Sequence, residues 1–324
     1  MTDRLRVRTY NVRFGDAILV TVPDRDPTSG NIISRNILID VGNALNKEGG
    51  ADEVFKPAVK DIIKQLRGRP LDLYIMTHEH LDHVQGLYYA ERKIYPHGEL
   101  KNRLNVDTAW FTASAETGYY DHHPEAKRKK QALTDAYDEI SLYLNKHTAS
   151  EAFQILLEIN NPRKTQDCVD YLKSLAPAER THYVYRGLDV DNLHPFQEAQ
   201  FEIWAPEEDT SDYYKQLMPM ALKAEARASG MSSSHSLLVP PSGVDAGAFY
   251  DLVEARSNGF ADNLLAIDKA GNNTSVVFLL RWRGWRLLFT GDAEVSSWQT
   301  MHDSGLLHQA DFMKVGHHGS HGKC

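Results

Sequence analysis

A cluster of three histidines and one aspartate lies within six positions, in the stretch THEHLDHVQG at residues 77–86. Imidazole and carboxylate groups bind zinc, manganese and iron, and a pair of such ions is a common hydrolytic device. His78 and His80 are two residues apart, so in an extended segment both side chains point to one side and can reach one ion. Asp82 and His83 follow where the chain has to turn, and can bind a second ion. We therefore expect two divalent metal ions, zinc or manganese, rather than a polar loop that is merely rich in histidine.

The apolar run LDLYIM, residues 71–76, ends directly before this cluster and predicts a buried strand. Residues 51–67 carry apolar side chains at helical spacing, and residues 36–42 predict another strand. Such a strand–helix–strand unit predicts a right-handed crossover and a covered sheet. Its functional residues belong in the loop after the carboxyl end of the strand, where the histidines fall. Two further strands, residues 5–12 and 17–22, precede the unit.

The rest of the chain divides into a helical part and a second group of strands. From about residue 114 to 180 the pattern is helical and rich in charge, which predicts an inserted helical subdomain. Strand patterns return at residues 181–187 and 199–206, and residues 275–292 predict two strands joined by a turn. The expected parts are therefore residues 1–113, 114–180 and 181–324.

Composition excludes several classes of protein. The chain has 324 residues, 42% of them hydrophobic, and a formal net charge of -8, so no overall positive field draws it to nucleic acid or anionic membrane. No apolar run reaches the roughly 18 residues of a membrane-spanning helix. Cys168 and Cys324 are the only cysteines, too few for a disulfide framework and wrongly spaced for a thiolate zinc site. We expect a cytoplasmic α/β protein that does not span a membrane.

The pattern His-x-His-x-Asp-His resembles the signature of the metallo-β-lactamase superfamily, which implies a four-layer αββα sandwich with a metal site at the sheet edges. Asp40 in LIDVG matches the acid that supports the histidine loop, and Asp292 in LLFTGDAE matches the carboxylate that bridges two ions. The segments FGDAILV and MKVGHHGSHG are most similar to the hydrolase domains of DNA-uptake competence proteins and to phosphorylcholine esterases. The resemblance covers residues 5–90 and 200–322, but not the helical insert.

The resemblance also implies a ligand set for two ions. One of the paired histidines, His317 and His318, completes it, because neighbouring residues of a strand point to opposite faces. By similarity to the esterases His318 is the ligand, and His317 contacts substrate or donates a proton; the reverse assignment stays open. The implied ligands are His78, His80, Asp82, His83, Asp292 and His318, with Asp40 in support.

Two features of the chain depart from the family pattern. Where many members place a third histidine, this sequence reads AGNNTSVVF, and the amide oxygens of Asn272 and Asn273 are poor zinc ligands. His182, His194 and His235 are the candidate replacements; without one, water fills the first ion's shell and the oxygen-rich site favours manganese. The family also continues beyond the HHGS motif, so we expect this chain to be part of a longer polypeptide, or a partner chain to complete its second half.

The expected activity is that of a two-metal hydrolase, a phosphodiesterase or nuclease that acts on nucleic acid through a metal-bound hydroxide. Asp82 or Asp292 would orient that hydroxide, and the metals would stabilise the developing negative charge. The same metals also suit a phosphocholine ester, a thioester or a lactam. A hypothesis from another class is a regulatory or binding module with a vestigial metal site, which the missing histidine favours and the intact Asp82 and Asp292 oppose.

Overall fold

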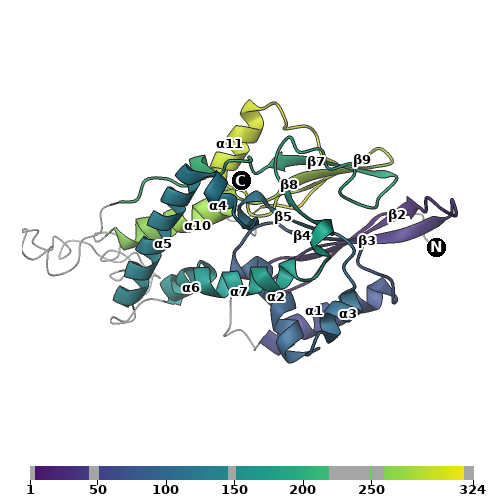
Figure 1. The fold of residues 1–324 in the computed structure, drawn as a ribbon, viewed down its shortest axis with the longest axis horizontal. Coiled ribbons are helices and arrows are strands. Elements are labelled where there is room, and N and C mark those ends of the chain that lie inside the picture. The colour runs from purple at the N-terminus through teal and green to yellow at the C-terminus, as the bar shows by residue number, and fades with distance from the viewer. Residues whose placement is uncertain (1–3, 44–50, 145–150, 219–248, 250–258, 317–324) are drawn as a thin grey trace, which may run out of the picture.

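The computed structural model describes residues 4–43, 51–144, 151–218, 249 and 259–316, and shows a mixed α/β protein built on two sheets (Figure 1). Sheet A contains six strands in the order β1-β2-β3-β4-β5-β6. Sheet B contains four, in the order β10-β9-β8-β7. The α/β class expected from the sequence is confirmed.

Sheet A combines an antiparallel edge with a parallel centre. β1, β2 and β3 pair antiparallel, whereas β3, β4, β5 and β6 pair parallel. Helix α1, Ala51–Leu66, connects the parallel neighbours β3 and β4, so the strand–helix–strand unit expected from the sequence is present. The strands are β1 Arg6–Thr9, β2 Ala17–Arg25, β3 Ile32–Val41, β4 Leu73–Met76, β5 Ala109–Thr112 and β6 Thr181–Val184.

Sheet B is formed by the carboxyl-terminal part of the chain. β7, Ala199–Ala205, β8, Val277–Trp282, and β9, Trp285–Phe289, pair antiparallel, and β10, Phe312–Met313, adds to β9 in parallel. The turn between β8 and β9 falls at Arg283 and Gly284, both with positive φ, as the sequence predicts. Among the described residues β10 is an edge strand of sheet B, and the side chains of Phe312 and Met313 are exposed.

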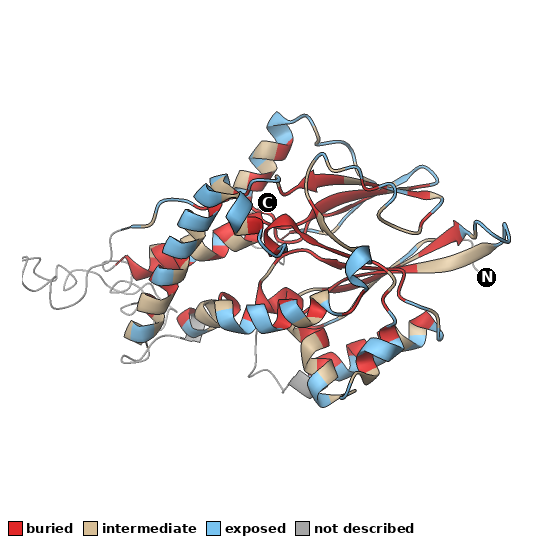
Figure 2. Ribbon diagram, viewed as in Figure 1, coloured by how far each residue is buried: buried red, intermediate tan, exposed pale blue. Residues whose placement is uncertain are grey.

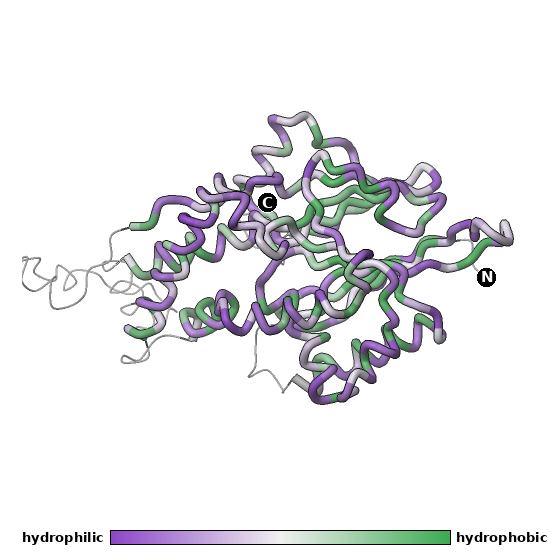
Figure 3. Tube along the Cα trace, in the orientation of Figure 1, coloured by the Kyte–Doolittle hydropathy of each residue, from purple (hydrophilic) through white to green (hydrophobic). Residues whose placement is uncertain are grey.

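Alternating side chains build a core between the two sheets. In β3 the side chains of Ile37 and Ile39 enter the same cluster as Phe278 of β8 and Phe289 of β9. The intervening Leu38 points to the other face of sheet A, because successive residues of a strand face opposite sides. The central strands are accordingly buried and apolar through most of their length, whereas β1 and β10 are exposed or half-buried (Figures 2 and 3).

Helices cover the outer faces of both sheets. The apolar stripe of α1 packs on sheet A together with α2, Leu81–Lys93, α3, Glu99–Leu104, and α7, Pro162–Lys173. On sheet B the outer face packs against α11, Val295–Asp303, through Met301. Both sheets are thus enclosed on two sides, which explains their nearly continuous apolar sequences.

The helical segment expected at 114–180 connects β5 to its neighbour β6. It contains α4, Tyr119–His122, α5, Pro124–Leu144, and α6, Glu151–Ile159, followed by α7. α7 packs against α2 in the main core, whereas α5 and α6 pack on α10, Phe260–Asn273 (Figure 1). Three short 3-10 helices, at Ala113–Ala115, Ala178–Arg180 and Ser211–Tyr213, complete the connections. No helix in the described part of the chain is long and apolar enough to cross a membrane.

Candidate metal centre

The histidine motif spans the end of β4 and the start of α2. β4 ends at Met76, residues 77–80 are extended, and α2 begins at Leu81. Asp82 and His83 therefore lie in the first turn of a helix, and Asp82 is only 3% exposed. The expectation that the whole histidine motif falls in a loop after the strand is therefore wrong for Asp82 and His83, because α2 packs its first turn into the core of sheet A.

Three of the expected ligands lie together. Ligand atoms of His78, His83 and Asp292 are all within 4.8 Å of one another, and all three residues are buried. The Nε2 atom of His83 lies 3.2 Å from Oδ2 of Asp292. The ring of His80 lies 4.7 Å from that of His78, between centroids, and Oδ2 of Asp82 lies 4.0 Å from Nε2 of His83. His80 and Asp82 thus lie next to the group of His78, His83 and Asp292 but are not part of it.

Glycines let three loops approach one another at this centre. A Cβ atom on Gly42 would lie under 3.0 Å from the backbone of Asp82 and His83, and one on Gly15 under 3.0 Å from the carbonyl oxygen of Asp82. The backbone nitrogen of Asp16 donates to that oxygen, at 3.1 Å, and the nitrogen of Gly42 donates to the oxygen of Asp16, at 2.9 Å. The FGD and DVG segments therefore fix the first turn of α2 by backbone contact.

Asp40 orients two of the histidines. Its carboxylate accepts hydrogen bonds from the nitrogen and hydroxyl of Thr77, at 2.8 and 2.6 Å, and from Nδ1 of His83, at 2.8 Å. A carboxylate only accepts, so the His83 proton sits on Nδ1 and leaves the Nε2 lone pair for a metal. Thr77 gives its only hydroxyl proton to Asp40 and therefore accepts from Nδ1 of His78, at 3.0 Å. His78 thus presents an unprotonated Nε2 in the same way.

Asp40 adopts a strained backbone to make these contacts. Its φ of 49° lies in the left-handed region, which costs a residue with a side chain about 1–2 kcal/mol. Three hydrogen bonds from buried donors offset that cost. Strain held by a surrounding network is typical of residues that position a functional site.

The site carries a net attraction for positive charge. Burial opposes a charge on His83, but the carboxylates of Asp292, Asp82 and Asp40 outweigh it and raise the pKa of His83 well above its ordinary value. Burial lowers the pKa of His78 well below its ordinary value, and its imidazole neighbours lower it further. Without a metal, one proton on His83 therefore balances part of the carboxylate charge.

A buried lysine that the sequence analysis missed also reaches this centre. The Nζ atom of Lys314 lies 3.2 Å from Oδ1 of Asp292, donates to the oxygen of Gly291, at 2.8 Å, and pairs with the carboxylate of Asp16. Burial alone would lower the pKa of the Lys314 ammonium, but Asp292 and Asp16 raise it. Lys314 follows β10, so the last described strand brings a permanent cation to the carboxylate that was expected to bridge two ions.

The other expected residues lie elsewhere. His317, His318 and His235 fall outside the described residues. The ring of His194 packs on Phe201 in the core between the sheets, at 4.6 Å between centroids. His182 lies on β6, opposite Trp110 of β5.

Oxygen-bearing side chains surround the centre where a third histidine was sought. Asn272 lies in the last turn of α10 next to Asp268 and Glu294, and all three are buried. The side-chain oxygen of Asn273 is already engaged, because it accepts hydrogen bonds from the backbone nitrogens of Glu294 and Ser297. The i, i+4 spacing of Asp268 and Asn272 in a helix could have predicted their contact, whereas the approach of Glu294 depends on the fold.

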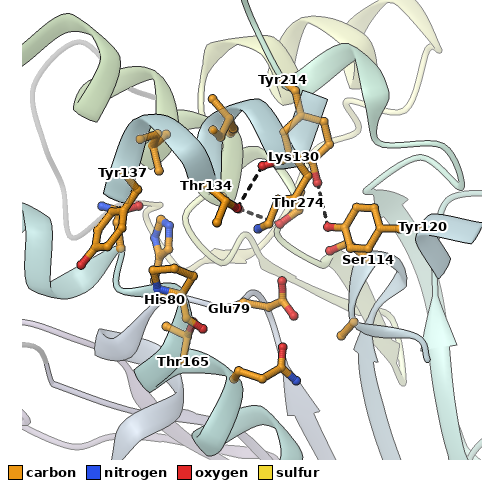
Figure 4. Close-up of a pocket in the computed structure, with 18 of the residues that line it drawn as sticks. Glu79, His80, Ser114, Tyr120, Lys130, Thr134, Tyr137, Thr165, Tyr214 and Thr274 are labelled. Atoms are coloured by element: carbon orange, nitrogen blue, oxygen red, sulfur yellow. Dashed lines mark hydrogen bonds between the residues drawn. The ribbon is translucent and has the colours of Figure 1, made fainter. Parts of the chain in front are cut away.

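Two cavities meet at His80. One, of about 320 Å³, is lined by His80, Asp82, Asn272 and Asp292 and by apolar side chains of α6 and α10. The other, of about 420 Å³, runs under α5 and α7. Figure 4 shows Tyr137 and Tyr120 on opposite sides of this second chamber, with His80 and Glu79 between them. Volumes of this size are typical of small-molecule sites.

Comparisons with known proteins give no family assignment: no protein-family model matches this chain, and neither does any curated protein. Support for a bound metal therefore comes from the donor set itself. The Nε2 atom of His78 is buried and has no hydrogen-bond partner among the described residues. A buried imidazole nitrogen without a partner, beside two carboxylates and a second imidazole, is a donor set that suits a divalent transition metal.

Proposed function

We propose that this chain is a metal-dependent hydrolase, with two divalent ions, zinc or manganese, at the centre around His78, His83 and Asp292. The observation that carries the proposal is the hydrogen-bond network of Asp40, which reaches His83 directly and His78 through Thr77 and so keeps the proton of each neutral imidazole on Nδ1, in a group that includes Asp292. A histidine that is needed only for packing requires no such control of its tautomer. His80 and Asp82, which border the group, would complete it, and His318 remains part of the proposed set.

The proposed fold family is the metallo-β-lactamase superfamily. Two features support this assignment. The two sheets face each other with helices on their outer sides, and the candidate metal centre lies at the ends of β4 and β9. The four-layer αββα arrangement of that superfamily has the same order of layers. The chain retains only two cysteines, and Cys168 is a buried free thiol, which fits the reducing, cytoplasmic setting included in the proposal.

The proposed reaction is hydrolysis of a phosphodiester, with nucleic acid as the substrate class that the sequence resemblance suggests. When bound, two divalent ions supply Lewis-acid activation of a water molecule and stabilise developing negative charge. Asp82 lines the 320 Å³ cavity beside His83, and its carboxylate would orient a water molecule there or take its proton. The apolar side chains of Ile155 and Leu156 line the same cavity. His317 remains the proposed proton donor.

A second candidate is a regulatory or binding module whose metal site is vestigial, and Lys314 favours it. A permanent ammonium at Asp292 and Asp16 neutralises carboxylates that ions would otherwise neutralise. The two candidates differ in their response to Lys314→Met. The hydrolase keeps its metal binding, because ions replace the lost charge, whereas the vestigial module loses about 3–5 kcal/mol of stability and added metal does not restore it.

The test measures bound metal and turnover of bis(p-nitrophenyl) phosphate on chelator-treated protein that has been incubated with manganese or zinc. We expect the wild type to bind metal and to hydrolyse the phosphodiester, and Asp292→Asn to lose both. Asp303→Asn is the matched control, because Asp303 is an exposed aspartate of the adjoining helix α11 whose hydrogen bonds, among the described residues, are to Gln299 and His302 of the same helix. Wild-type protein that binds neither ion would reject the proposal.

A further inference from the structure

The side chain of Asn272 is placed at the candidate centre by the end of α10. It is 1% exposed and lines the 320 Å³ cavity together with His80, Asp82 and Asp292. It therefore borders the same space as three of the residues expected to bind or serve metal ions.

The orientation of the Asn272 amide is fixed by its neighbours. Nδ2 donates to Oε1 of Glu294, at 2.8 Å, and lies 3.4 Å from Oδ2 of Asp268. Both partners are carboxylates, which accept hydrogen bonds, so the NH2 group must face them and Oδ1 must point the other way. Oδ1 is buried and has no hydrogen-bond partner in the part of the chain that the structure describes.

An unused buried amide oxygen needs an explanation, because leaving such an acceptor unpaired costs about 1–3 kcal/mol. The end of α10 also packs directly against the histidine loop. A Cβ atom on Gly271 would lie under 3.0 Å from Nε2 of His80, so any larger residue at this position would have to displace the His80 ring. This contact brings the residue after Gly271 next to His80.

We propose that Oδ1 of Asn272 is a ligand of the metal ion held by His78 and His80, in place of a third imidazole, and that it makes the site prefer manganese to zinc. Amide and carboxylate oxygens suit manganese and magnesium, whereas imidazole suits zinc. Glu294 and Asp268 are the positioning residues that hold the amide in this orientation. This inference rests on the proposed metal centre, and the following measurement separates the failure of one from the failure of the other.

The experiment compares the dissociation constants of manganese and zinc, measured by calorimetric titration, for the wild type, Asn272→Leu and Asn272→His. We expect Asn272→Leu to weaken manganese binding at least about tenfold and zinc binding much less. Asn272→His supplies an imidazole and should shift the ratio of the two constants toward zinc by about tenfold or more. The ratio does not depend on how much of a variant sample is folded, so a partly unstable variant still gives an answer.

Asn263→Ala is the control on the same helix. Asn263 is buried, and its amide is fully used by the backbone of Met218, at 2.7 and 2.9 Å. The Asn263→Ala variant should have a lower free energy of unfolding and an unchanged ratio of manganese to zinc affinity. If Asn272→Leu lowers both affinities equally, or neither, Asn272 has only a structural role and the inference falls while the metal centre stands. If the wild type binds no metal, the proposed function falls as well.

Discussion

Replacing Asp40 by asparagine tests the link between the buried acid and the two histidines. Asparagine keeps the shape of the side chain but replaces one acceptor oxygen by an NH2 donor. In either orientation of the amide, that donor faces a group that now donates to Asp40, either the backbone nitrogen of Thr77 or the Thr77 hydroxyl and Nδ1 of His83. At least one buried hydrogen bond to a charged acceptor is lost.

The size of the effect follows from those contacts. Hydrogen bonds to charged groups contribute about 1.5–3 kcal/mol each. We therefore expect Asp40→Asn to lower the free energy of unfolding by about 2–4 kcal/mol. With its Nδ1 no longer facing a carboxylate, His83 can place its proton on Nε2, the atom that would bind the metal. Loss of such an orienting partner weakens metal binding about 10–100-fold.

Two assays measure these effects separately. Urea unfolding of metal-free protein gives the stability change, and calorimetric titration with manganese gives the affinity. Asp61→Asn is the matched control, because Asp61 is partly exposed and pairs with Arg8 and Tyr10 far from the site. It should cost no more than about 1 kcal/mol and leave the affinity unchanged. Manganese affinity in Asp40→Asn equal to that of the wild type would refute the tautomer argument.

Three further predictions concern backbone packing, pH and thiol chemistry. Gly42→Ala should cost about 1–3 kcal/mol and weaken metal binding, because its methyl group collides with Asp82; Gly30→Ala, in open space, should leave metal binding intact. Since the pKa of His83 is raised on folding, metal-free protein should lose stability as pH rises from the ordinary histidine value through the raised one, as urea midpoints would show. Metal binding should also release the His83 proton, which would appear as titration heats that depend on the buffer. A metal-free stability that does not fall over this pH range would contradict the raised pKa of His83. Burial raises the pKa of the Cys168 thiol to about 12, so in a Cys324→Ser variant no thiol should react with a disulfide reagent at pH 8 until denaturant is added.

The local sequence pattern predicted the elements that carry the site, but not how the loops meet. The apolar run before Thr77 predicts β4, and the spacing of His78 and His80 places both rings on one side, as their 4.7 Å separation shows. These features depend on neighbouring residues only. The strand–helix–strand pattern likewise predicts that β3 ends beside β4, where Asp40 lies.

Contacts between distant segments were not predictable in this way. The sequence gives no sign that the Thr77 hydroxyl donates a hydrogen bond to Asp40, because Asp40 lies on the neighbouring strand. Lys314 reaches Asp292 only because β10 pairs in parallel with β9. Asn272 was considered only as a weak substitute for histidine, since its local sequence shows Asp268 one helical turn earlier but not Glu294, 22 positions later, which accepts a hydrogen bond from its Nδ2. Such features depend on packing, not on spacing.

The proposal that this is a metal centre is tested most directly by anomalous diffraction at the manganese edge, from crystals of the chain grown with manganese. We expect one peak within bonding distance of His78, His80, Asp292 and Oδ1 of Asn272, and a second peak next to Asp82 and His83. Crystals that show manganese at neither position, with Lys314 still paired to Asp292, would contradict it and favour the vestigial module.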